Sequence, residues 1–212
     1  MTETSPVGSV AAVPPALADA PDEARYAYVA RQGRPLPFFE VRARGEDGAV
    51  VPWDGETPGE LEVRGPWVAS AYYRGDGLSA DRWTEDGWFR TGDVVTIGRD
   101  GTITITDRTK DLVKSGGEWI SSVALENALM GHPAVAEAAV VAVPDPKWHE
   151  RPLAVVVLRP GQSASAEELR VHLAPGFARW WLPERFEFVE AIPRGATGKF
   201  LKRALRERYA GA

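Results

Sequence analysis

The sequence predicts an α+β protein with two units: a β-rich, barrel-like unit over residues 1–109 and a small α+β unit over residues 110–212. Short strand patterns separated by Gly and Pro turns fill the first unit, whereas helix and strand patterns interleave in the second. The charge is also uneven, with 11 basic and 18 acidic residues in the first unit against 14 and 12 in the second. A length of 212 residues suffices for two such domains.

The composition excludes several classes of protein. The chain contains no cysteine, which removes disulfide frameworks, zinc ribbons and thiol nucleophiles. Its three histidines are scattered, and its net charge of −5 argues against a nucleic-acid partner. No apolar run approaches the ~18 residues of a membrane span, and the first residues have neither a basic region nor an apolar core. We therefore expect no transmembrane segment and a cytoplasmic location.

Alternating apolar and polar residues predict the strands of the first unit. Residues 1–25 are rich in Ala, Pro and Val without periodicity, so we expect loop or extended chain there. Ser79 is expected to cap a short helical turn that ends at Trp83. The predicted strands cover residues 37–44, 49–52, 60–64, 88–97 and 102–107, with turns at 45–48 and 99–101.

The second unit combines amphipathic helices with buried strands. The helix over 121–130 has Ser121 or Ser122 as a cap, and Ser165 with Glu168 forms a capping-box pattern that opens a helix through Leu173. A final helix places Leu201, Leu205 and Tyr209 on one stripe. Apolar runs predict strands over 134–143, 153–158 and 185–189.

Two segments carry candidate binding residues. In WFRTGD (88–93), Asp93 ends a strand beside a glycine, where a carboxylate can bind the hydroxyls of a ribose or simply cap a turn. In the polar stretch 107–114, the charge balance and the structural pattern both change, as is typical of an interdomain hinge. The following Ser115-Gly116-Gly117 is expected to be a flexible loop that either passes close to a ligand or serves as an ordinary linker.

A third segment, IPRGATGKF (192–200), places Lys199 on a Pro- and Gly-framed loop. It is not a Walker A loop, because Pro193 stands where that motif needs glycine and Phe200 where it needs Ser or Thr. A lysine there can act as a point charge on developing negative charge, or be merely solvated. The run 194–208 holds six basic residues and one acid, which indicates either a solvated helix or a cationic element that faces an anionic ligand.

Taken in order, these segments resemble the signature motifs of the AMP-forming acyl-adenylate ligases, the superfamily of acyl-CoA synthetases, firefly luciferases and peptide-synthetase adenylation domains. The resemblance covers essentially the whole chain, and the sequences SGGEWISSVALE and WWLPERFEFVEAIPR are most similar to medium- or long-chain fatty-acyl-CoA synthetases. The matching stretches are MTETSP (1–6), GELEVRGPWVASAYYR (59–74), DGWFRTGD (86–93), DRTKDLVKSGGEWISSVALE (107–126) and PRGATGK (193–199).

The resemblance implies a reaction in two halves, with a fatty acid, ATP and coenzyme A as substrates. In the first half the carboxylate attacks the α-phosphate of ATP to give an acyl-adenylate and pyrophosphate. Thr2 would bond the α-phosphate, Glu3 would hold Mg²⁺, and Asp93 with Arg108 would grip the ribose. Lys199 would bridge the acyl oxygen and the α-phosphate, where negative charge develops.

In the second half, coenzyme A displaces AMP. The resemblance implies that residues 110–212 form a mobile C-terminal domain that swings about Lys110, withdraws Lys199 and presents the loop from Lys114 to Trp119. Gly117 would line the pantetheine tunnel, and Lys114 stands where a second lysine serves thioester formation in some members. Glu126, on the next helix, is expected to be structural.

The chain also departs from the family pattern. Gly195 stands where Thr is more common and is expected to loosen the loop. The phosphate loop (S/T)-G-T-T-G-x-P-K is absent from the sequence, and the first half of the adenine motif is missing. We therefore expect the chain to be the C-terminal portion of a fatty-acyl-CoA synthetase, with residues 1–109 as the last, β-barrel-like part of the large AMP-binding domain. It would need the missing N-terminal region of the same enzyme and would be inactive alone.

Two alternatives stay open at this point. One is an acyl-AMP ligase that passes the acyl group to a carrier protein, although GGEWIS favours coenzyme A. The other is a non-catalytic binding module that keeps the adenylate-domain fold. The sequence leaves the acyl chain length and the oligomeric state undetermined.

Overall fold

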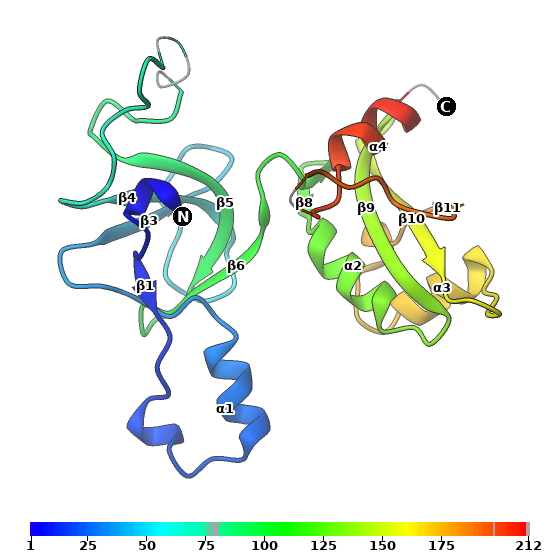
Figure 1. Cartoon of the computed structure of the whole chain (residues 1–212), viewed down its shortest axis with the longest axis horizontal. Coiled ribbons are helices and arrows are strands. Elements are labelled where there is room, and N and C mark those ends of the chain that lie inside the picture. The colour runs from blue at the N-terminus through cyan, green and yellow to red at the C-terminus, as the bar shows by residue number, and fades with distance from the viewer. Residues whose placement is uncertain (76, 78–80, 197, 211–212) are drawn as a thin grey trace. The chain divides into compact units, whose positions relative to one another are not determined.

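The computed structural model describes residues 1–75, 77, 81–196 and 198–210, so Ser79 and its expected cap lie outside the described residues. The chain divides into two compact units, Met1–Thr109 and Lys110–Ala212 (Figure 1). Each unit has its own main sheet and its own buried apolar core, and the predicted α+β class is confirmed.

An antiparallel four-stranded sheet forms the centre of the first unit. Alternate apolar residues of its strands, such as Val41, Val63 and Val95, fill one core cluster, as the period of two requires. The sheet is open in the described part of the unit and does not close into a barrel. In spatial order its strands are β3 (Glu40–Arg44), β4 (Gly59–Arg64), β5 (Phe89–Ile97) and β6 (Ile103–Arg108).

Two expectations for the first unit are wrong. Residues 49–52 form no strand, since Val50 makes only a single bridge to Arg44. The N-terminal stretch is not all loop, because helix α1 begins at Asp22; it buries no side chain and so left no apolar stripe to detect. The remaining elements are η1 (Thr2–Thr4), β1 (Ser9–Val10), η2 (Pro15–Leu17), α1 (Asp22–Val29) and β2 (Arg34–Pro35), with β1 and β2 paired antiparallel.

A mixed sheet around strand β10 forms the centre of the second unit. Strand β10 pairs along its length with β9, and on its other side with β11 in parallel and with β7 at His149. The strands are β7 (Val113–Ser115), β8 (Glu118–Ile120), β9 (Val135–Asp145), β10 (His149–Leu158) and β11 (Arg185–Phe188). The helices are α2 (Ser122–Met130), α3 (Ala166–Leu173), η3 (Arg179–Trp181) and α4 (Lys202–Tyr209).

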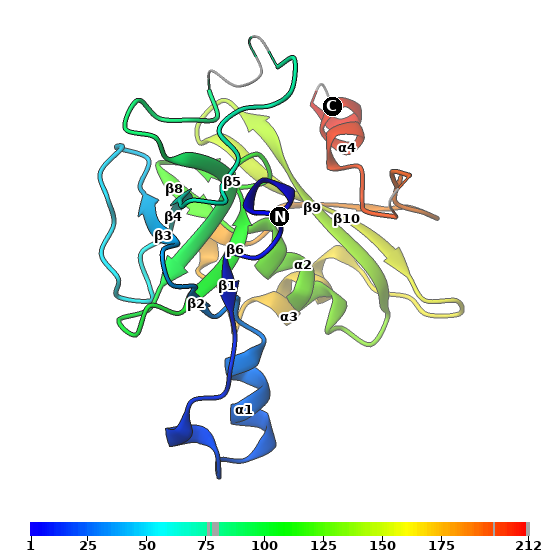
Figure 2. The same ribbon diagram turned by 60° about the vertical axis from the view of Figure 1, so that its left-hand side comes forward.

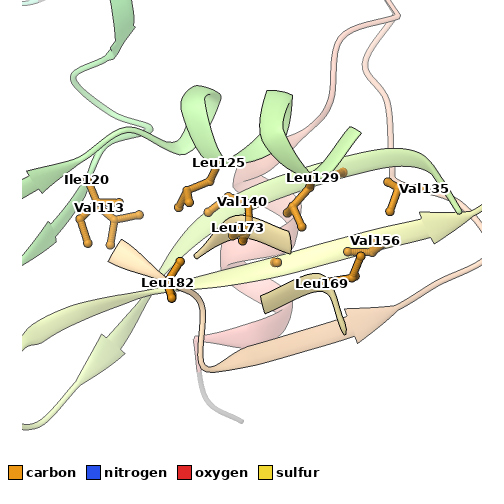
Figure 3. Close-up of a cluster of buried hydrophobic side chains, with 12 residues drawn as sticks. Val113, Ile120, Leu125, Leu129, Val135, Val140, Val156, Leu169, Leu173 and Leu182 are labelled. Atoms are coloured by element: carbon orange, nitrogen blue, oxygen red, sulfur yellow. The ribbon is translucent and has the colours of Figure 1, made fainter. Parts of the chain in front are cut away.

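This sheet carries a separate core on each face. Ala154 and Val156 of β10 belong to the cluster under α2 and α3, whose side chains Figure 3 draws. The intervening Leu153 and Val155 belong to the cluster that includes Leu205 of α4. Figure 2 accordingly places α4 on one side of β9 and β10 and the other two α-helices on the opposite side.

The two predicted helix caps are confirmed, whereas the final helix begins at Lys202, so that Leu201 lies before it and is exposed. The Ser121 hydroxyl accepts the Ala124 backbone N–H at 3.1 Å, and Ser165 and Glu168 form the complete capping box. No helix within the described residues is long and apolar enough to cross a bilayer.

Candidate functional site

The structure brings Asp93 and Arg108 together in the first unit. They are register partners on β5 and β6, and Arg108 Nε lies 3.4 Å from Asp93 Oδ1. Asp93 is the more buried, with 20% of its side chain exposed against 53% for Arg108. Asp93 does not end its strand as expected, because β5 continues to Ile97. A carboxylate held beside a guanidinium can accept hydrogen bonds from a diol, as a ribose requires.

The backbone around Asp93 is fixed from both sides. The Thr91 hydroxyl donates to the Leu61 carbonyl at 2.9 Å and accepts the Asp93 backbone N–H at 3.0 Å. Gly92 has φ 74°, a conformation that favours glycine, and its carbonyl accepts the Thr109 N–H at 2.9 Å. The TGD sequence therefore fixes the backbone from which the Asp93 carboxylate projects.

Thr2 and Glu3 form a second group, on η1. The Tyr72 hydroxyl donates to Glu3 Oε1 at 2.7 Å, and Ala69 N–H donates to the Glu3 carbonyl at 2.8 Å. The bond from Tyr72 lowers the pKa of Glu3 and raises that of Tyr72. The first residues of the chain are thereby attached to the segment 69–72, with the Glu3 carboxylate kept ionised.

Glu3 fits the way proteins usually hold Mg²⁺. No group of three or more His, Asp or Glu side chains that could hold a metal alone exists among the described residues. Mg²⁺ is commonly bound through one or two carboxylates together with substrate phosphates, and so does not need such a group. A single half-buried, ionised carboxylate at Glu3 is compatible with this arrangement.

In the second unit the Gly116-Gly117 segment is a tight β-hairpin turn rather than the expected flexible loop. Strands β7 and β8 pair Lys114 with Trp119 and Ser115 with Glu118, and the Lys114 ammonium lies 5.9 Å from the Trp119 ring centroid. Both glycines have positive φ, of 60° and 86°. We call this element, residues 113–120, the glycine hairpin.

Strand β10 and the turn before it hold the glycine hairpin in place. Gly116 N–H donates to the Trp148 carbonyl at 2.9 Å, and Lys114 N–H donates to Glu150 Oε2 at 2.8 Å. A Cβ on Gly116 would lie 2.9 Å from the Trp148 ring, whereas one on Gly117 would meet nothing within 4 Å. The turn is therefore closed on the Gly116 side and open at Gly117.

Lys199 ends a second hairpin, residues 194–200, which we call the lysine hairpin. Arg194 bridges Phe200, and Gly195 N–H donates to the Lys199 carbonyl at 2.9 Å. The Arg194 guanidinium donates to the Gly198 carbonyl and to Glu137 of β9, both at 2.6 Å. Lys199 itself is exposed, and Thr197 lies outside the described residues.

The basic run 194–208 is largely neutralised within its own unit. Arg194 pairs with Glu137, and Arg203 with Glu207. On the buried side of α4, Lys202 lies 2.6 Å from Glu126 and Arg206 lies 2.9 Å from Asp111. The run is therefore no open cationic surface.

Glu126 also accepts the Val140 N–H at 2.7 Å, which agrees with the structural role expected for it.

Lys110 is exposed and is the first residue of the second unit. The residues that hold the two hairpins, namely Glu137, Glu150, Arg151 and Arg194, were missed by the sequence reasoning. A signal was available, because His149-Glu150-Arg151 places charged residues at the start of an otherwise apolar strand. Charges at such a position require partners, and here the partners lie in the glycine hairpin and in the segment 180–184.

Two family models match the chain. The model described as "AMP-binding enzyme" matches residues 1–73, and that described as "AMP-binding enzyme C-terminal domain" matches residues 124–199. Curated relatives include a long-chain-fatty-acid–CoA ligase of Thermus thermophilus, 52% identical over 99% of this chain. A medium-chain-fatty-acid–CoA ligase of Ectopseudomonas oleovorans is 42% identical over 99% of it. The chain spans 39% and 38% of the length of these two relatives.

Solved structures agree with this assignment. The o-succinylbenzoate CoA synthetase of Bacillus subtilis, in complex with its acyl-adenylate intermediate, is similar over 97% of this chain and 40% of its own, with TM-score 0.81 and 31% identity. ATP-bound MatB of Rhodopseudomonas palustris is similar over 85% of this chain and 36% of its own, with TM-score 0.76 and 32% identity. The chain therefore belongs to the AMP-binding enzyme family, in the branch that contains the acyl-CoA ligases.

Proposed function

We propose that this chain provides the ribose-binding pair and the mobile C-terminal domain of an ATP-dependent, AMP-forming fatty acid–CoA ligase. The observation that carries the proposal is that one compact unit, Lys110–Ala212, presents two separately anchored hairpins, one with Lys199 and the other with Gly117. A swing of that unit about Lys110 would exchange one hairpin for the other between two half-reactions.

In the adenylation half, a carboxylate oxygen of the fatty acid attacks the α-phosphorus of ATP, and the bond to pyrophosphate breaks. Asp93 accepts hydrogen bonds from the ribose hydroxyls, with Arg108 beside it to hold its charge and direction. Thr2 bonds the α-phosphate. Lys199 places its ammonium beside the oxygens on which charge accumulates. Glu3 would hold Mg²⁺, which supplies charge neutralisation on the phosphates.

In the thioester half, the thiol of coenzyme A releases its proton to solvent and its sulfur attacks the acyl carbonyl carbon, and AMP leaves with the electrons of the broken C–O bond. The open side of the turn at Gly117 leaves room for the pantetheine chain, which a side chain there would obstruct. Lys114 and Trp119 face each other on the adjoining strands and would flank the reacting thiol.

We further propose that the chain alone does not adenylate, because its sequence lacks the (S/T)-G-T-T-G-x-P-K phosphate loop. Exchange of labelled pyrophosphate into ATP, measured on the purified chain with fatty acids, is expected to stay at background. Robust exchange would contradict this part of the proposal.

A chimera tests the main proposal. This chain would replace the matching 39% of the Thermus thermophilus ligase, to which it is 52% identical. We expect the chimera to catalyse pyrophosphate exchange and to form acyl-CoA. A folded chimera with neither activity would overturn the proposed function.

The acceptor of the acyl group is tested in the same chimera. One relative is the 2,3-dihydroxybenzoate-AMP ligase of Bacillus subtilis, 40% identical over 88% of this chain. An acyl-AMP ligase is therefore the second candidate function, and we would expect it to pass the acyl group to a carrier protein. Thioester formation with coenzyme A, and none with a phosphopantetheinylated carrier protein, is the expected result. The remaining hypothesis is a module without ligase function. Calorimetry of the isolated chain with AMP and with coenzyme A tests it, and the absence of binding for both ligands would favour this hypothesis.

A further inference from the structure

We propose that Arg151 is a positioning residue for thioester formation, one that holds the glycine hairpin at a fixed place on the second unit. The inference rests on the proposed function, because it assigns the hairpin to the half-reaction with coenzyme A. It concerns a side chain that lies behind the turn and does not touch the proposed substrates.

Arg151 lies on β10 with only 9% of its side chain exposed. Its Nη1 donates to Ser115 Oγ at 3.2 Å and to the Trp180 carbonyl at 2.6 Å. Its Nη2 donates to the Leu182 carbonyl at 3.2 Å and to Glu184 Oε1 at 3.1 Å. A planar guanidinium with several fixed donors can join distant segments in one geometry, and here it joins β10, the glycine hairpin and the segment 180–184.

Most of these acceptors are uncharged. Ser115 is itself buried, with 4% exposure, and the one carboxylate partner, Glu184, is 67% exposed. Arg151 Nε is buried without a hydrogen-bond partner in the described structure. A buried cation with so little charge compensation is a costly way to stabilise a core, and an apolar residue would be the simpler solution. The guanidinium instead fixes the position of Ser115, the residue before the glycine pair, because it bonds Ser115 to two other segments in one geometry.

The contact with Ser115 completes a set of attachments along the hairpin. Lys114 and Gly116, on either side of Ser115, are bonded through their backbone N–H groups to Glu150 and Trp148. Ser115 itself is the register partner of His149. Three consecutive hairpin residues are therefore attached to four consecutive residues, 148–151. Among these attachments, Arg151 makes the one that reaches a hairpin side chain and continues beyond the hairpin.

The consequence concerns Gly117. A Cβ on Gly117 would meet no described atom within 4 Å, so the space beside its Cα is open. The attachments of the neighbouring Ser115 and Gly116 therefore contribute to its position. A displacement of a substrate-binding group by about 1 Å can cost roughly 10²-fold in rate, so loosening this support should affect the half-reaction that uses Gly117. Adenylation, which would use Lys199 of the other hairpin, should be spared.

The experiment compares Arg151→Met, Arg151→Lys and Ser115→Ala with the control Arg159→Met. Arg159 also donates to a carbonyl, that of Pro133, but is exposed and distant from the hairpin in the sheet. In the chimera, Arg151→Met should lower the rate of acyl-CoA formation about 10- to 100-fold while pyrophosphate exchange stays within about threefold. Arg151→Lys should recover part of the loss, and Ser115→Ala should show a smaller loss of the same kind.

Equal losses in both half-reactions, or no loss in either, would overturn the proposal, since a purely structural role predicts a parallel decline. Amide hydrogen exchange on the isolated chain gives an independent measurement. In Arg151→Met, exchange at Gly116 should accelerate about tenfold or more relative to the amides of the β9–β10 ladder. If Arg151→Met does not fold, Ser115→Ala decides by the same two measurements.

The outcomes also separate this inference from the proposed function. A wild-type chimera without pyrophosphate exchange would contradict the proposed function. Amide exchange would still decide whether Arg151 holds the glycine hairpin, and unchanged protection of Gly116 in both variants would contradict that claim directly.

Discussion

The glycine hairpin and the lysine hairpin are both fixed through an arginine, but the two arginines lie in different environments. Arg151, behind the glycine hairpin, has 9% of its side chain exposed and donates chiefly to uncharged oxygens. Arg194, within the lysine hairpin, is 45% exposed and pairs with Glu137, which is 35% exposed. The glycine hairpin is therefore held by buried hydrogen bonds, and the lysine hairpin by an ion pair at the surface.

This difference indicates how each hairpin responds to change. A buried network of hydrogen bonds resists displacement, because each bond that breaks leaves an unsatisfied group that costs about 1–3 kcal/mol. An exposed ion pair is screened by water and salt and contributes about 0.2–1 kcal/mol. The glycine hairpin should therefore be the more rigid of the two and the less tolerant of substitution, whereas the lysine hairpin should adjust more easily.

The largest expected effect lies at the tip of the lysine hairpin. Lys199→Ala should lower pyrophosphate exchange by the chimera about 10²–10³-fold, the usual cost of losing one group that stabilises developing charge. The exposed side chain should contribute little to the free energy of unfolding. Arg203→Ala is the control, since Arg203 is a base of the same region with 85% of its side chain exposed. Equal losses in the two variants would argue against a specific role for Lys199.

The support of the glycine hairpin contains one strained residue. His149 has φ 72° without being glycine, a conformation that costs about 1–3 kcal/mol. His149→Gly should raise the free energy of unfolding by about 1 kcal/mol, after the extra entropy of glycine in the unfolded chain is deducted. Urea denaturation measures this change. His149→Ala is the control, because it removes the ring but keeps the Cβ and its strain; an equal gain in both variants would assign the effect to the imidazole.

The surface anchor of the lysine hairpin should matter less. Glu137→Gln removes the charge that faces Arg194, and we expect a loss of less than about 1 kcal/mol in unfolding free energy. Pyrophosphate exchange should fall about two- to fivefold, because the hairpin is looser when it meets ATP. Glu187→Gln is a matched control, since its pair with Arg185 is similarly exposed. If Glu137→Gln lowered pyrophosphate exchange as much as Arg151→Met is expected to lower acyl-CoA formation, the two hairpins would not differ in the way described.

The sequence predicted those helices and strands whose residue pattern reflects burial of one face. The strands of residues 60–64 and 88–97 and the helices capped by Ser121 and Ser165 were found, because apolar periodicity and caps are local consequences of folding. Helix α1 buries no side chain, so nothing in its pattern could report it. The Asp93–Arg108 pair was inferred from the family resemblance, and the structure adds that the two residues are register partners.

The supports of the two hairpins could not be predicted in the same way. Arg151 and Ser115 are 36 residues apart, and Arg194 and Glu137 are 57 apart. Their contacts depend on which strands pair, and no local pattern encodes that pairing. The glycine pair was visible in the sequence, but a turn and a linker look alike until strands β7 and β8 are known to pair.

The smallest expected effect tests whether Gly195 loosens the lysine hairpin. Gly195 lies outside the positive-φ region, and a Cβ there would be 3.4 Å from Leu201 Cδ2, an ordinary contact. Gly195→Ala should therefore raise the free energy of unfolding by about 0.4–1 kcal/mol, because it restricts the unfolded chain without straining the folded one. Gly198→Ala is the matched control, since Gly198 lies in the same turn at φ 77° and an alanine there should destabilise the protein. Thermal denaturation should show a higher melting temperature for Gly195→Ala and a lower one for Gly198→Ala. A lower melting temperature for Gly195→Ala would mean that the fold itself requires glycine at position 195.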